Sequence, residues 1–142
     1  MSRLETRRET GGPADARFDR VIVADWSSAS SPSPATPSAD AIWLGSAGAE
    51  ESSRYHRTRA AAEAALRAAV LDALAAGRRL LIGFDFPMGY PAGFAAALTG
   101  TADPRAVWHW LAERLEDGPD NRNNRFALAA EINRLLAPGP FW

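Results

Sequence analysis

The sequence predicts an α/β protein built on a mixed sheet, and two short segments carry most of this prediction. Residues 20–26 and 80–86 are apolar runs, with Asp25 and Asp85 close to their ends. Continuous apolar runs of this length are typical of strands that are buried on both faces under helices. A carboxylate at the end of such a strand costs free energy unless it has a partner or a function. The two aspartates are therefore the first candidate site residues.

The segment between these two strands predicts two more strands and a long helix. Residues 41–45 have the pattern of a short second strand, and residues 54–57 that of a weaker third. A helix is predicted over residues 59–76, because Thr58 is a good N-cap and Gly77 suits the left-handed position that ends a helix.

Two stripes of side chains are expected on the 59–76 helix. Residues at helical spacing are predicted to face the core, namely Ala62, Leu66, Val70 and Leu74. A neighbouring stripe is predicted to form an i,i+4 ladder of charges, made of Arg59, Glu63 and Arg67.

After the 80–86 strand the sequence predicts three helices and no further strand. Proline and glycine clusters separate these helices, which are expected over residues 91–100, 103–116 and 124–136. Three residues of the second helix are expected to face the core, namely Val107, Leu111 and Leu115.

This order of elements is the opening of a ribonuclease H-like fold: a three-strand meander, a crossover helix and a strand that returns beside the first. The right-handed crossover rule allows the returning strand to lie parallel to the first. Asp25 and Asp85 would then be neighbours at one sheet edge, where α/β proteins place their sites. Paired carboxylates suit Mg²⁺ or Mn²⁺, which support phosphoryl transfer. Such a site needs at least one further carboxylate.

The polar segment 116–125 supplies the remaining candidates. Asp120 is a candidate third metal ligand, and Asn124 and Arg125 are candidate phosphate-binding residues. Ser27, directly after the first strand, is a candidate phosphate ligand in the turn. We expect residues 117–125 of this segment to lie at the same sheet edge as the two aspartates.

Each candidate also has a purely structural interpretation. Asp25 could simply cap the turn that follows the first strand. The polar segment has the composition of an ordinary loop between two helices. Arg125 could pair with Asp120 or Glu131 instead of a phosphate. The two histidines are His56, a weak candidate base, and His109, which is expected to pack between tryptophans.

Composition excludes several kinds of chemistry. The chain has no cysteine, which rules out thiolate catalysis, disulfides and cysteine-ligated zinc. It has no lysine either, which rules out a Walker-type lysine and a Schiff base. A net charge of −1 favours a nucleotide or a small nucleic-acid substrate over long duplex. No apolar run is long enough to span a bilayer, so we expect a cytoplasmic protein without a membrane partner.

Several segments together resemble a bacterial family of predicted nucleases with a ribonuclease H-like fold. They are Val23-Ala24-Asp25-Trp26-Ser27, Gly83 to Pro91, Asn123 to Phe126, and Gly139-Pro140-Phe141-Trp142. The resemblance spans residues 18–142, and the most specific part is Asp85-Phe86-Pro87-x-Gly89-x-Pro91. It implies that Asp25 and Asp85 are the first two acidic positions of a metal-dependent site. Some relatives carry a label naming molybdopterin guanine dinucleotide synthesis.

The sequence departs from the family pattern in one respect. The ribonuclease H-like fold needs a further strand and a late helix with another carboxylate, and neither is evident after Asp85. We therefore expect residues 18–142 to be the front portion of one longer domain, preceded by a disordered tail over residues 1–17.

Three classes of function stay open at this point. The first is a metal-dependent phosphoester hydrolase or nuclease. The second is a nucleotide- or phosphate-binding module of the actin-like kinase type, although that type expects a glycine where this chain has Trp26-Ser27-Ser28. The third is a non-catalytic accessory protein in molybdopterin-type cofactor synthesis.

Overall fold

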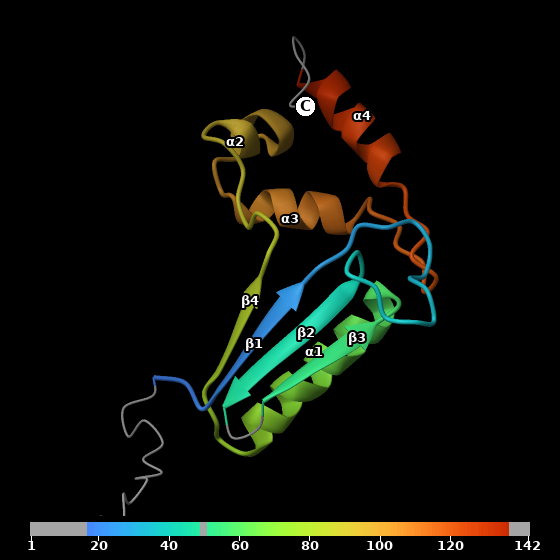
Figure 1. The fold of residues 1–142 in the computed structure, drawn as a ribbon. Helices are drawn as coiled ribbons and strands as arrows, with labels where there is room; N and C mark the ends of the chain where they lie inside the picture. Colours follow the sequence, from blue (N-terminus) through green and yellow to red (C-terminus); the bar gives the residue numbers. More distant parts are fainter. Residues whose placement is uncertain (1–16, 49–50, 137–142) are drawn as a thin grey trace, which may run out of the picture.

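A computed structural model describes residues 17–48 and 51–136 as a mixed α/β structure with a four-stranded sheet and four helices (Figure 1). One helix covers one face of the sheet, and the other three lie beyond the end of the sheet to which strands β1 and β4 point (Figure 1). The predicted tail, residues 1–17, lies outside the described residues except for its last position. Within the described ranges, no helix combines the length and the apolar character needed to cross a membrane.

The sheet has the topology that the sequence predicts. Its strands are β1 (Arg20–Asp25), β2 (Ile42–Gly48), β3 (Ser52–His56) and β4 (Leu80–Phe84), in the spatial order β3-β2-β1-β4. The meander β1–β2–β3 is antiparallel, and β4 pairs in parallel with β1. The prediction that the strands ending near Asp25 and Asp85 are adjacent and parallel is therefore confirmed.

Helix α1 (Arg59–Ala75) makes the crossover between β3 and β4, and its two predicted ends are confirmed. The hydroxyl of Thr58 accepts a hydrogen bond from the backbone N–H of Ala61 at 3.2 Å, and Gly77 has a left-handed φ of 60°. Leu66 and Ala69 of α1 pack against buried residues of the sheet, including Ile22. This contact forms the core between α1 and the sheet.

The predicted core stripe of α1 is right at its start and wrong at its end. Leu66 is buried, but Val70 is 37% exposed and Leu74 is 71% exposed. The buried stripe is instead Ala62, Leu66, Ala69 and Ala73. An α-helix has 3.6 residues per turn, so each four-residue step rotates the stripe by about 40°. A stripe built only from four-residue steps therefore leaves the contact face after two turns.

The face of the sheet opposite α1 is open at its centre. Val23 is 55% exposed and lies between two glycines, Gly45 on β2 and Gly83 on β4. Leu81 of β4 is 42% exposed. Because side chains alternate along a strand, Asp25 follows Val23 on this same open face.

A second core joins the three remaining helices, α2 (Phe94–Thr99), α3 (Arg105–Ala112) and α4 (Arg125–Leu135). Its buried members are Phe94, Val107, Leu128 and Ile132. Val107 and Leu111 lie in this core as predicted, but Leu115 is 44% exposed. Because α3 ends at Ala112, Leu115 no longer follows the helical spacing. After β4, the described residues contain only an isolated bridge between Asp117 and Asn123 and no further strand.

Candidate functional site

Two carboxylates lie side by side at the ends of β1 and β4. The parallel register pairs Ala24 with Phe84, which places the next residues, Asp25 and Asp85, on neighbouring strand ends. The Asp85 carboxylate accepts a hydrogen bond from the backbone N–H of Trp26 at 2.9 Å. The side chains of both aspartates are exposed, so an ion or a substrate can reach them from solvent.

The two carboxylates influence each other directly. Partial desolvation raises the pKa of Asp25 above its ordinary value, and the hydrogen bond and negative charge of Asp85 raise it further. Two oxygen-donor groups that repel each other when ionised fit a divalent cation, because its charge removes the repulsion. Mg²⁺ is commonly held by one or two carboxylates, with water and substrate phosphate filling its other positions. The pair therefore fits the predicted cation.

A third protein carboxylate does not join this pair among the described residues. Within residues 17–48 and 51–136, no group of three histidine, cysteine, aspartate or glutamate side chains could hold a metal together. Asp120 instead accepts a hydrogen bond from Arg122 at 2.7 Å. The backbone N–H and then the side chain of Arg122 lower the pKa of Asp120, which keeps it ionised and paired. Its role as a third ligand therefore stays a prediction without geometric support.

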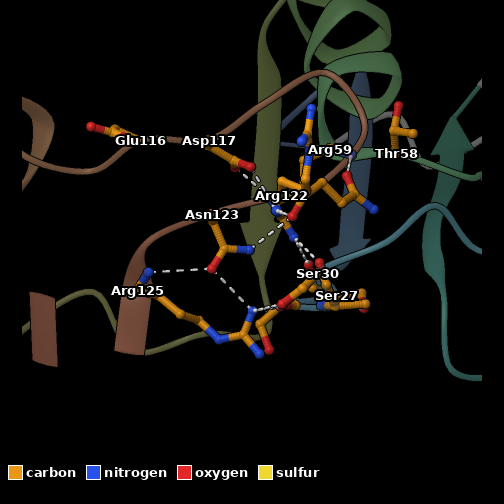
Figure 2. A network of polar contacts seen from close by, with 12 residues as sticks. Ser27, Ser30, Thr58, Arg59, Glu116, Asp117, Arg122, Asn123 and Arg125 are labelled. Atoms are coloured by element: carbon orange, nitrogen blue, oxygen red, sulfur yellow. Dashed lines mark hydrogen bonds and ion pairs between the residues drawn. The ribbon is translucent and has the colours of Figure 1, made fainter. Parts of the chain in front are cut away.

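A buried arginine connects this end of the sheet to the polar segment (Figure 2). Arg59 makes a two-point ion pair with Asp117, with N–O distances of 2.5 and 2.6 Å. The same guanidinium donates to the backbone carbonyls of Ser27, Ala29 and Asn121. The prediction that Arg59 belongs to a solvated charge ladder is wrong, because only the Glu63–Arg67 pair of that ladder forms.

Asn121 is the second buried polar anchor of this network. Its carbonyl oxygen accepts from the backbone N–H of Arg59 at 2.8 Å, and its amide donates to the carbonyls of Ser31 and Arg57. It is 1% exposed and has a left-handed φ of 70°. Nothing in the sequence distinguishes Asn121 or Asp117 from the other polar residues of the segment, so sequence reasoning missed both.

The predicted placement of the polar segment beside the end of β1 is correct. Arg125 donates to the carbonyl of Ser28 and to the hydroxyl of Ser30 (Figure 2). Ser28 is three residues after Asp25, a chain distance of at most about 11 Å. The polar segment therefore lies near the two aspartates, as expected.

The candidate phosphate ligands all hold the loops together. Asn124 accepts from the backbone N–H of Glu116 and donates to the carbonyl of Arg114. The hydroxyl of Ser27 accepts from the backbone N–H of Ala29 at 3.3 Å, and Arg125 bonds the loop after β1 rather than Asp120 or Glu131. Their phosphate-binding roles stay predictions.

The two histidines lie on different elements and in different environments. His56 ends β3, where burial and then Arg54 lower its pKa, and its buried Nε2 atom has no hydrogen-bond partner. His109 is exposed on α3 rather than packed, as is Trp108 at 39% exposure. A cavity of about 390 Å³ lies between α2, α3 and α4, with apolar walls and no carboxylate among its lining residues.

Comparisons with known proteins add no further assignment. No family model, curated protein or solved structure matches this chain. The features of the chain that bear on function are the geometry of the two aspartates and the residues that surround them.

Proposed function

We propose that this chain is a metal-dependent phosphoester hydrolase with a ribonuclease H-like arrangement. The observation that carries the proposal is the pair of exposed carboxylates, Asp25 and Asp85, on adjacent parallel strand ends. Ligand sites in α/β sheets lie outside the carboxyl ends of the strands, which is where both aspartates are.

The strand arrangement supports the ribonuclease H-like part of the proposal. An antiparallel meander, a crossover helix and a fourth strand parallel to the first form the spatial order β3-β2-β1-β4. This is the beginning expected of that fold. The resemblance of the segments around Asp25 and Asp85 to predicted nucleases agrees with the same arrangement.

The residues of such a site would have two roles, namely binding of the ion and support of the neighbouring loop. Asp25 and Asp85 would hold Mg²⁺ or Mn²⁺ through carboxylate oxygens, while the Trp26 N–H fixes the orientation of Asp85. The ion, when bound, supplies positive charge that stabilises a phosphate and activates water. Arg59 and Arg125 fix the loop after β1 and so hold the rim of the site.

Binding of Mn²⁺ tests this proposal most directly. Isothermal titration should show binding by the wild type and at least a tenfold weaker affinity for Asp85→Asn, because one of two carboxylate ligands is lost. Asp40→Asn is a matched control, since Asp40 is exposed and lies outside the pair. Equal Mn²⁺ binding by the wild type and Asp85→Asn would eliminate the pair as ligands.

A binding module without turnover is the second candidate. The observation in its favour is that the described residues bring only two carboxylates together. Under this alternative, the 142-residue chain should hydrolyse single-stranded, duplex and branched nucleic acids and simple nucleotides slowly or not at all. Robust Mn²⁺-dependent turnover that Asp85→Asn abolishes would overturn the binding-only alternative.

A further inference from the structure

An aromatic pair lies in the same row of the sheet as Asp25. The register of β1 and β2 places Trp43 directly opposite Asp25. The register of β2 and β3 places Tyr55 directly opposite Trp43. Because residues that pair across strands lie on the same face, the row on the open face reads Asp25, Trp43, Tyr55.

The loop between β1 and β2 fixes both rings by their polar atoms. The indole N–H of Trp43 donates to the carbonyl of Ser38 at 2.9 Å, and the Tyr55 hydroxyl donates to the carbonyl of Pro34 at 2.8 Å. The ring centroids are 5.3 Å apart with an interplanar angle of 61°. Both residues are partly exposed, and with their N–H and O–H donors engaged, their rings are the apolar π surface on this part of the open face.

The spacing of this row suits a ligand that carries a ring and a phosphate. Neighbouring strands are about 5 Å apart, so Trp43 lies one strand from Asp25 and Tyr55 lies two. A nucleoside monophosphate holds its planar base and its phosphate on the two sides of one sugar. Because the two rings are inclined at 61°, its base could stack on one of them and meet the other at its edge, while its phosphate reaches the aspartates.

We propose that Trp43 and Tyr55 form a stacking platform for the base of a nucleoside phosphate whose phosphate lies at Asp25 and Asp85. This inference rests on the proposed function, because the aspartates place the phosphate. The Trp43 N–H and the Tyr55 O–H are both donated to backbone carbonyls, and ring stacking does not depend on the identity of the base, so the platform accepts purines and pyrimidines alike. Purines bind somewhat more tightly because their rings are larger.

Calorimetric titration of the full chain with AMP and with ribose 5-phosphate, each with Mn²⁺, tests the platform. The wild type should bind AMP roughly tenfold more tightly than ribose 5-phosphate, which lacks the base. Trp43→Leu should abolish this preference. Tyr55→Phe is the matched control, since it removes only the hydroxyl bond to Pro34 and should keep the preference.

A second measurement does not depend on any variant. The base protons of AMP should shift upfield in the NMR spectrum on binding, because they lie over aromatic rings. Equal affinities for AMP and ribose 5-phosphate in the wild type, or a preference that survives in Trp43→Leu, would overturn the platform.

The same titrations separate the two proposals. If both ligands bind equally and Asp85→Asn weakens both, the carboxylate site stands and the platform is wrong. If AMP is preferred through Trp43 without Mn²⁺ and in Asp85→Asn, the platform stands as a base site and the metal site is wrong. If neither ligand binds the wild type with Mn²⁺, both proposals are overturned.

Discussion

Arg59 and Asp117 form a two-point ion pair although 58 residues separate them in the sequence. The pair joins the first residue of α1 to the loop between α3 and α4, and so connects the two hydrophobic cores of the described chain. The Arg59 side chain is 10% exposed and that of Asp117 is 33% exposed. The Arg59 guanidinium also donates to carbonyls of the loop that follows Asp25, so loss of the ion pair should also loosen that loop beside the site.

Removal of the Asp117 charge should destabilise the fold. Asp117→Asn leaves the buried Arg59 without its anionic partner, which should lower the free energy of unfolding by about 2 kcal/mol. Urea unfolding monitored by circular dichroism measures this. Glu63→Gln is the control, because the exposed Glu63–Arg67 pair should contribute at most about 0.5 kcal/mol. Similar losses of unfolding free energy in the two variants would show that the buried Arg59–Asp117 pair stabilises the fold no more than an exposed pair does.

The left-handed conformation of Asn121 can be separated from its hydrogen bonds by two substitutions. Asn121→Gly removes the three side-chain hydrogen bonds and should cost about 2 kcal/mol of unfolding free energy. Asn121→Ala removes the same bonds and adds strain at positive φ, which should cost about 1 kcal/mol more. Equal stability of the two variants would mean that the backbone there relaxes without cost.

The corrected core face of α1 predicts unequal effects for two leucines of one helix. Leu66→Ala should reduce the free energy of unfolding by about 3 kcal/mol, because it leaves a cavity against the sheet. Leu74→Ala should change it by less than about 0.5 kcal/mol, since Leu74 is 71% exposed. Chemical denaturation of both variants compares the predicted stripe with the observed one. Comparable losses of unfolding free energy in the two variants would support the core face predicted from the sequence, which includes Leu74.

His56 should make stability depend on pH near neutrality. Its pKa in the folded state is below the ordinary value of 6.5, so the unfolded chain binds the proton more readily. The free energy of unfolding should therefore fall as the pH drops below about 6.5. Asp19, Asp103 and Asp120 have lowered pKa values, so their contributions are lost only in acid, below the ordinary value of 3.8.

Unfolding at about pH 7.5 and about pH 5.5 isolates the contribution of His56. His56→Phe should be less sensitive to pH than the wild type over this window. His109→Gln is the control for the loss of an imidazole, because His109 is exposed whereas His56 is partly buried. A wild type and a His56→Phe variant with identical slopes would contradict the prediction.

Local patterns in the sequence were sufficient to predict the strands of the two aspartates, the ends of α1 and the proximity of Asp25 to Asp85. Apolar runs that end near Asp25 and Asp85 predicted strands, and the Thr58 cap and Gly77 predicted the ends of α1. These features are encoded locally, by side-chain hydrophobicity and by backbone preferences of single residues. The crossover rule then limited the ways to arrange them, which made the parallel pairing of β1 and β4 predictable.

Which polar residues hold the loops and which face solvent depends on contacts between distant segments of the folded chain. Arg59 has the same sequence context as an exposed ladder residue, yet it is buried because Asp117 and Asn121 satisfy its donors from a distant loop. The row that aligns Trp43 with Asp25 likewise depends on the register of β1 and β2. Hydrogen bonds and registers between distant segments are set by the packing of the whole chain, and a pattern within one segment does not contain them.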